Sequence, residues 1–288
     1  MERERVTVWN TVPSLMEMTV EAAAGGRPRP EHALRRVFLS GDWIPVTLPD
    51  RIRDTFPGAE VVSLGGATEA AIWSIFHRIG SLPADAVSVP YGRPLANQSW
   101  HVLHENGLPC PDWVPGELYI GGVGVAAGYW KDAEKTAARF IRHPISGERL
   151  YRTGDIGRYL PDGEIEFLGR EDTQVKILGH RIELGEIEAA LLEHPEVQSA
   201  IVCATGNPRS SRRLVAHVIP AQPVSSTPAE AQTGWAAFLR QKLPHYMVPG
   251  EFVLHAAFPL TPNGKVDRQE LARHTIDSRA VSESEAPA

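Results

Sequence analysis

Cysteine is scarce in this chain, and no apolar run is long enough to cross a membrane. The two cysteines, Cys110 and Cys203, do not form a Cys-X-X-Cys pair. The sequence therefore predicts neither a disulfide scaffold nor a thiolate zinc site, and it favours a reducing, cytoplasmic location. The charged residues 1–5 are not followed by an apolar signal region, so no secretory signal is predicted.

An excess of positive charge is also absent. The formal net charge is −6, which provides no basic field to attract nucleic acid or anionic lipid. Hydrophobic residues make up 42% and charged residues 22% of the 288 residues, which is ordinary globular composition. We expect one large domain or two smaller ones, with neither a nucleic acid nor a membrane as partner.

The first part of the chain alternates between apolar and helical segments. Residues 6–12, 36–40 and 60–64 are predicted strands, and residues 13–22 and 45–56 are predicted helices. Short buried strands joined by helices are typical of a parallel sheet.

A different pattern follows, in which predicted strands are separated by Gly and Pro turns. These strands cover residues 100–104, 117–121, 149–160 and 164–168. The turn Pro-Asp-Gly between the last two is a strong hairpin signal. The pattern predicts a β-rich subdomain.

A third pattern begins near residue 172. It predicts a hairpin over 173–182 that turns near Gly179, and then an amphipathic helix with Leu184, Ile187 and Leu191 at helical spacing. Further elements are strands at 197–203, 214–219 and 252–255, a helix at 235–243, and a loop at 220–232. The prediction is a compact α+β domain over residues 172–275, after a larger domain at 1–171 and before a disordered tail at 276–288.

Four loops are candidate sites, and two of them carry side chains that suit nucleotide chemistry. Residues 65–69, Gly-Gly-Ala-Thr-Glu, follow a predicted buried strand, where backbone N–H groups and Thr68 suit a phosphate and Glu69 suits Mg²⁺. Asp155, just past another strand, is placed to accept both hydroxyls of a ribose. The other two loops lie at residues 168–183 and 262–268. Taken singly, each loop is better explained as an ordinary turn, helix cap or solvent-facing loop.

Together, the order and spacing of these loops resemble the later core motifs of the adenylate-forming superfamily, in its nonribosomal peptide synthetase branch. Residues 116–122 with 127–130, and residues 243–249, match further motifs of that family. The resemblance runs from about residue 6 to residue 271. It implies an α/β fold: the C-terminal part of an adenylate-forming core, with a partial parallel sheet and a β-rich subdomain, followed by a small α+β lid domain.

The resemblance also implies roles for individual residues. Asp172 is similar to the hinge about which the lid rotates, and the loop at Gly179 would face the phosphopantetheine arm of a carrier protein. Lys265 is similar to the catalytic lysine, whose ammonium would neutralise charge as the substrate carboxylate attacks the α-phosphate of ATP. Thr68 and Glu69 would act with it, Glu69 as the Mg²⁺ ligand. The nucleotide-binding set is Gly66, Ala67, Thr68, Asp155, Phe167 and Arg170.

Two departures from the family pattern stand out. Gly65 occupies the position where the family usually places an aromatic residue that stacks on adenine. Adenine must therefore be held by something else, or less tightly. The family's N-terminal phosphate loop and the acidic residue that binds the substrate amino group have no counterpart here, so we expect a missing N-terminal half supplied in cis or in trans.

The side-chain pocket of the family points to the substrate. The series resembles that of cysteine-activating domains, with Phe38 as a mild departure because Leu is more usual there. A mostly apolar pocket with two small polar residues suits a thiol side chain. Without the alignment, ordinary core packing would explain the same residues. The pocket positions are Asn10, Phe38, Ser40, Leu64, Ile72 and Trp73.

The sequence thus predicts ATP-dependent activation of an amino acid, L-cysteine foremost, and its transfer to a carrier protein in siderophore or thiazoline biosynthesis. One alternative is a non-catalytic fragment or partner-binding remnant that turns over nothing. Another is an acyl- or aryl-activating relative, which the pocket residues and the motif at 179–183 argue against.

Overall fold

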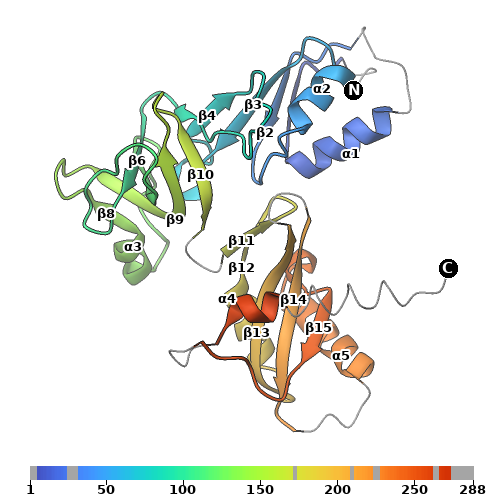
Figure 1. Cartoon of the computed structure of the whole chain (residues 1–288). Helices are drawn as coiled ribbons and strands as arrows, with labels where there is room; N and C mark the ends of the chain where they lie inside the picture. The colour runs from blue at the N-terminus through green and yellow to red at the C-terminus, as the bar shows by residue number, and fades with distance from the viewer. Residues whose placement is uncertain are drawn as a thin grey trace. The chain divides into compact units, whose positions relative to one another are not determined.

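The computed structural model describes residues 5–24, 32–170, 174–207, 211–222, 228–261 and 266–273. The chain divides into two compact units, Met1–Asp172 and Thr173–Ala288, and each unit has hydrophobic clusters of its own (Figure 1). No helix in the described ranges is long and apolar enough to cross a membrane.

The first unit contains a five-stranded sheet in the order β1-β2-β3-β4-β5. Its first three strands are parallel, as expected from the alternation of strands and helices, whereas β4 and β5 run antiparallel and make the sheet mixed. The strands are β1 (Val8–Thr11), β2 (Arg36–Leu39), β3 (Glu60–Gly65), β4 (Ile75–Arg78) and β5 (Arg93–Pro94).

Two helices, α1 (Pro13–Ala24) and α2 (Leu48–Thr55), cover one face of this sheet (Figure 1). Proline stands in the first turn of each helix, where its missing N–H costs no hydrogen bond. The strand residues Val37, Leu39 and Val61 are buried in one cluster with side chains of both helices. Side chains alternate along a strand, so the next residues along these strands face the opposite side of the sheet.

A second sheet in the first unit is antiparallel throughout, in the order β10-β9-β7-β6, with β8 beside β9. Its core contains Trp100, Leu118, Ile120 and Tyr151. The bounds are β6 (Gln98–Leu103), β7 (Gly116–Gly122), β8 (Phe140–Arg142), β9 (Arg149–Tyr159) and β10 (Ile165–Arg170).

Helix α3 (Ala133–Arg139) precedes β8 and was not predicted. It buries none of its side chains, so it has no apolar periodicity to reveal it. Its local signal is Asp132, whose carboxylate accepts a hydrogen bond of 2.9 Å from the Lys135 backbone N–H as an N-cap.

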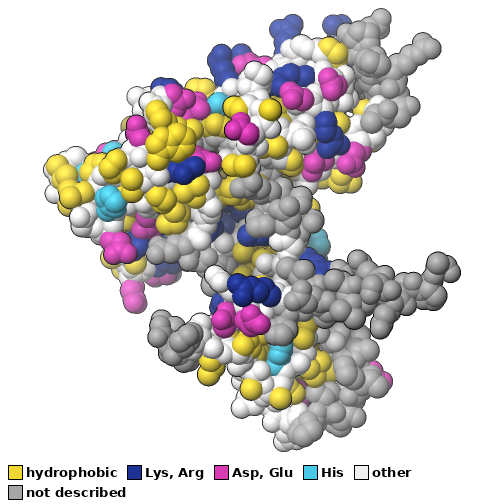
Figure 2. Space-filling model, viewed as in Figure 1, with side chains coloured by type: hydrophobic (Ala, Val, Ile, Leu, Met, Phe, Trp, Pro, Cys, Tyr) yellow, Lys and Arg dark blue, Asp and Glu magenta, His cyan; other side chains and the backbone are white. Residues whose placement is uncertain are grey.

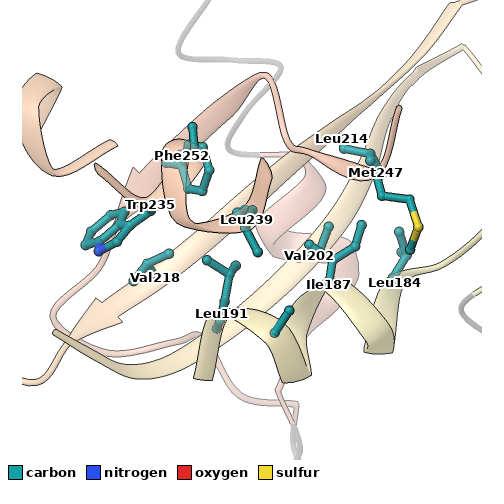
Figure 3. Close-up of a cluster of buried hydrophobic side chains, with 14 of the residues drawn as sticks. Leu184, Ile187, Leu191, Val202, Leu214, Val218, Trp235, Leu239, Met247 and Phe252 are labelled. Atoms are coloured by element: carbon teal, nitrogen blue, oxygen red, sulfur yellow. The ribbon is translucent and has the colours of Figure 1, made fainter. Parts of the chain in front are cut away.

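The second unit begins with the expected hairpin, β11 (Gln174–Ile177) and β12 (His180–Glu183), followed by α4 (Leu184–Leu192). A three-stranded sheet in the order β13-β14-β15 packs against α4 and α5. Figure 3 shows side chains from these elements meeting in one core, with Ile187 and Leu191 from α4, and Trp235 and Leu239 from α5. The bounds are β13 (Val197–Asn207), β14 (Ser211–Pro220), α5 (Pro228–Arg240) and β15 (Glu251–Leu254).

The predicted boundary between a loop and a helix in this region is wrong. A loop was expected over residues 220–232 and a helix over 235–243, but α5 already begins at Pro228. Proline is favoured in the first turn of a helix, and here it opens one. The predicted hinge Asp172, the predicted catalytic Lys265 and the tail at 276–288 lie outside the described residues.

Candidate nucleotide site

The loop that follows β3 is tightly closed by its own backbone. Gly66 has a φ of +142°, and a Cβ atom there would lie 2.7 Å from the Ile72 carbonyl oxygen, so only glycine fits. The backbone N–H groups of Ala70 and Ile72 donate to the Ala67 carbonyl at 2.9 and 3.0 Å. The loop contains the short helix η1 (Thr68–Ala70), and it leaves Thr68 exposed.

The same loop holds two strained residues. Ala71 and Ile72 have φ values of 59° and 67°, in the left-handed region that non-glycine residues rarely adopt. For a β-branched residue such as Ile72 this conformation is an outlier. Strain of this kind persists only where the surrounding structure fixes it, and it is concentrated at ligand sites.

Glu69 is held by a tyrosine from a distant part of the chain. The Tyr129 hydroxyl donates to Glu69 Oε1 at 2.7 Å, and the Ala126 backbone N–H donates to the Glu69 carbonyl at 2.8 Å. Burial raises the pKa of Tyr129 above its ordinary value, and the neighbouring Tyr151 and Glu69 raise it further. Tyr129 therefore stays a neutral hydrogen-bond donor and orients the carboxylate.

Asp155 and Arg170 form a buried ion pair across β9 and β10. They are cross-strand neighbours, and Arg170 Nη1 lies 2.5 Å from Asp155 Oδ1. Arg170 Nη2 also donates to the Thr153 carbonyl at 3.0 Å, and the Asp155 backbone N–H donates to Thr153 Oγ1 at 2.9 Å. A β-bulge at Leu168 shifts the register of β10 just before Arg170. The pair thus has a fixed position and direction.

Tyr91 connects the loop after β3 with the Asp155–Arg170 pair. The Gly66 backbone N–H donates to its hydroxyl, and the charges of Asp155 and Arg170 both act on it. Burial of the hydroxyl, and after it the charge of Asp155, raises the pKa of Tyr91. The Tyr91 ring also contacts Phe167, with centroids 5.5 Å apart. The loop after β3, Phe167, Asp155 and Arg170 therefore meet around one tyrosine.

The six predicted pocket residues lie on the same sheet and on the loop that follows it. Asn10 pairs with Phe38 in the ladder, and both point away from the helix-covered face. Leu64 lies on that open side directly before Gly65, and Phe38, Ser40 and Leu64 are partly buried. Trp73 is also partly buried, whereas Ile72 is 59% exposed. The positions share one neighbourhood, and their binding role stays a prediction.

Comparison with known proteins identifies the family of this chain. The AMP-binding enzyme family matches residues 1–130, and the AMP-binding enzyme C-terminal domain matches residues 186–265. Together the two matches cover more than half of the chain. The chain belongs to the adenylate-forming AMP-binding enzymes.

Relatives place it among the adenylation domains of nonribosomal peptide synthetases. Bacitracin synthase 1 of Bacillus licheniformis is 48% identical over 280 residues, which are 96% of this chain and 5% of that protein. Pyochelin synthetase PchF of Pseudomonas aeruginosa is 53% identical over 206 residues, 72% of this chain and 11% of that protein. The chain thus spans a small part of these relatives.

A solved structure confirms the α/β adenylate-forming fold with its C-terminal domain. It is an NRPS protein containing adenylation and PCP domains, bound to a vinylsulfonamide inhibitor. It superposes with a TM-score of 0.75 at 28% identity, over 93% of this chain and 45% of that one.

The second unit of this adenylation domain also contains a predicted site residue, Gly179. Gly179 lies at the tip of the β11–β12 hairpin, where Leu178 and Gly179 have φ values of 51° and 83°. Positive φ at both central residues is the geometry of a type I′ turn. The His180 ring stacks on Tyr246 with centroids 3.8 Å apart and an interplanar angle of 7°, which supports the hairpin from the side.

The residues of the site fit a Mg²⁺-bound nucleotide. Mg²⁺ is usually held in proteins by one or two carboxylates together with substrate phosphates, and Glu69 offers an oriented carboxylate beside exposed Thr68. No cluster of three or more His, Cys, Asp or Glu side chains occurs among the residues that the structure describes. Two further members of the site, Tyr91 and Tyr129, were not predicted individually, although Tyr129 lies in the quoted motif at 127–130.

Proposed function

We propose that this domain activates an amino acid with ATP, forms the aminoacyl-adenylate, and passes the aminoacyl group to the phosphopantetheine thiol of a carrier protein. The observation that carries the proposal is that Tyr91 joins the loop after β3, which also holds the Tyr129-oriented carboxylate of Glu69, to the Asp155–Arg170 pair. The relatives supply further support, since bacitracin synthase 1 and pyochelin synthetase PchF are by name a synthase and a synthetase.

In this proposal each group acts on a different part of the nucleotide. Asp155 accepts hydrogen bonds from the ribose hydroxyls, and Arg170 holds the carboxylate in place. Thr68 and the loop N–H groups contact the phosphates, and Glu69 holds Mg²⁺, which neutralises phosphate charge when bound.

The chemistry then consists of two displacements. An oxygen of the amino-acid carboxylate attacks the α-phosphorus, a new P–O bond forms, and pyrophosphate leaves with the electrons of the broken anhydride bond. Lys265 stabilises the charge that develops in this step. In the second step the carrier thiolate attacks the acyl carbon and AMP leaves. Gly179 lies on the loop proposed to face the carrier, and Asp172 is the proposed hinge.

We further propose cysteine as the preferred amino acid. Phe38 and Leu64 provide an apolar wall, while Asn10 and Ser40 add small polar groups on the open side of the sheet. Such a wall suits the polarizable thiol of cysteine. One-group differences in a pocket are worth about 1–3 kcal/mol, so serine and small apolar amino acids should compete weakly but measurably.

Exchange of labelled pyrophosphate into ATP tests the function directly. The 288-residue chain is assayed alone and with an added N-terminal adenylation half, against cysteine, serine, alanine and valine. We expect exchange with cysteine at least about tenfold above serine. Exchange with another amino acid would overturn the cysteine assignment. A folded protein with no exchange in either sample would support the non-catalytic alternative.

The ribose contact has its own test. Asp155→Asn keeps the size of the side chain but removes the negative charge that faces Arg170. We expect AMP affinity to fall by about ten- to a hundredfold, because a charge-assisted contact is lost. Asp112→Asn, at an exposed position, is the matched control. Unchanged AMP affinity in the Asp155 variant would exclude the ribose role.

A further inference from the structure

Gly65 stands where the family usually has an aromatic residue, and in this structure the ring of Tyr91 lies next to it. A Cβ atom built on Gly65 would lie 2.7 Å from Tyr91 Cδ2 and Cζ, and closer still to Cε2. The three nearest atoms to that position all belong to the Tyr91 ring. The ring of Tyr91 therefore fills the space into which a side chain at residue 65 would extend.

Backbone strain is not the reason for the glycine at this position. Gly65 is the last residue of β3, and its φ lies outside the positive range that favours glycine, unlike that of Gly66. An L side chain could adopt this backbone. What excludes it is the aromatic ring already present, so Gly65 and Tyr91 form a complementary pair.

Tyr91 is held firmly in that place. Its backbone N–H donates to the Ile165 carbonyl at 2.8 Å, and its hydroxyl accepts from Gly66. Trp100 packs edge-on against the ring, with centroids 5.3 Å apart, and Phe167 packs at a tilt. Tyr91 as a whole is nevertheless only partly buried.

We infer that Tyr91 supplies the aromatic surface on which the adenine base stacks, in place of a side chain at residue 65. The inference rests on the proposed function. It adds a contact to the adenine base, whereas Asp155 is proposed to bind the ribose and Glu69 the Mg²⁺ at the phosphates. A planar base has a π-face that stacks on an aromatic ring whatever strand or loop delivers the ring. Tyr91 delivers it from the segment before β5.

A direct binding experiment separates the base from the rest of the nucleotide. Binding of AMP and of ribose 5-phosphate to the 288-residue chain is measured by calorimetry for the wild type, Tyr91→Leu and Tyr91→Phe. We expect Tyr91→Leu to weaken AMP binding about tenfold, because base stacking is lost, and to leave ribose 5-phosphate binding unchanged. Tyr91→Phe keeps the ring and should stay within about threefold of the wild type.

Moving the aromatic ring from residue 91 to residue 65 tests whether AMP affinity can be restored. Gly65→Tyr alone should disrupt the loop, because its side chain would overlap the Tyr91 ring. The double variant Gly65→Tyr with Tyr91→Ala supplies one ring from the other position, and it should recover most of the AMP affinity lost in Tyr91→Leu.

The results of these experiments test the role of Tyr91 separately from the proposed function. Equal AMP affinity in wild type and Tyr91→Leu would overturn the inference and leave the proposed function standing. The inference would also be overturned if Tyr91→Leu lost as much affinity for ribose 5-phosphate as for AMP and the double variant did not restore it. Tyr91 would then have a structural role only. Loss in Tyr91→Phe as large as in Tyr91→Leu would assign the effect to the hydroxyl instead. No AMP binding by the folded wild type would overturn the proposed function together with the inference.

Discussion

The five-stranded sheet of the first unit and the three-stranded sheet of the second are covered to different extents. In the second unit, Val202 and Val218 pack into the helix-lined core, while Val215 and His217 on the other face are also fully buried. In the first unit the helix side is buried, whereas on the other face Val62 is buried but Phe38 and Leu64 are only partly so. A sheet buried on both faces provides stability, whereas a half-covered sheet leaves side chains available to a ligand.

The two units nevertheless share one feature. In the first unit, Ala71 and Ile72 have positive φ in the loop next to Glu69, and Arg5, Asn97, Trp113 and Lys131 have it elsewhere. Among the described residues of the second unit, Leu178 alone of the non-glycine residues has positive φ, and it lies beside Gly179. In both units, strained backbone occurs on a loop that the sequence assigns to ligand or carrier contact.

The largest expected effect tests how tightly the core of the second unit is packed. Leu191 is fully buried in the core of Figure 3, and its neighbour Leu192 is 50% exposed. Leu191→Ala should lower the free energy of unfolding of the second unit by about 2–5 kcal/mol, because it leaves a cavity. Urea unfolding measures this, and Leu192→Ala is the matched control. A similar loss in both variants would contradict the tightly packed core.

The next prediction separates binding from chemistry. Lys265→Ala should reduce the pyrophosphate exchange rate by about 10²–10³-fold, because it removes a charge that stabilises the transition state. AMP binding should change little, since Asp155 and Tyr91 belong to the first unit. Lys242→Ala, which removes a partly exposed lysine paired with Glu193, is the control. Normal exchange by the Lys265 variant would remove this residue from the mechanism.

A smaller effect is expected at the carboxylate that holds Mg²⁺. Tyr129→Phe removes the hydrogen bond to Glu69, and we expect the Mg²⁺ concentration for half-maximal exchange to rise by about tenfold. The exchange rate at saturating Mg²⁺ should recover. Tyr119→Phe removes a comparable bond of 2.9 Å to Glu117 and serves as the control. An unchanged Mg²⁺ requirement would show that Tyr129 does not orient the ligand.

The regular parts of the fold could be predicted from the sequence because their signals are local. The strands β1, β2 and β3, and the hairpin turning at Gly179, show clear apolar patterns or turn residues. Helix α3 shows none because it buries nothing. The start of α5 at Pro228 was missed for another reason, because proline, serine and alanine there indicate a loop as readily as a helix.

The site was predictable only in part, for a different reason. Thr68, Glu69 and Asp155 belong to contiguous motifs that the family resemblance identifies. The contact of Tyr91 with Gly65, and that of Tyr129 with Glu69, join residues far apart in the chain. No periodicity or spacing encodes such a pairing, so it becomes visible only after the strands are placed.

The smallest expected effect uses one buried thiol in each unit to compare the two directly. Burial raises the pKa of Cys203 to about 11 and also raises that of Cys110. At pH 8 only about one Cys203 thiol in a thousand would be ionised, and the thiolate is the form that reacts. Alkylation of either cysteine must therefore proceed mainly through opening of its unit.

Cys203 lies on the second face of the doubly covered sheet, where its thiol contacts the Arg268 carbonyl at 3.7 Å. We expect Cys203 to be alkylated several-fold more slowly than Cys110, as measured by mass spectrometry over time, with unfolded protein giving the intrinsic rates. Leu191→Ala should abolish this difference by loosening the second unit, whereas Leu192→Ala should preserve it. If Cys203 reacted as fast as Cys110 in the wild type, cover on both faces of its sheet would not protect Cys203 better than the segment between β6 and β7 protects Cys110.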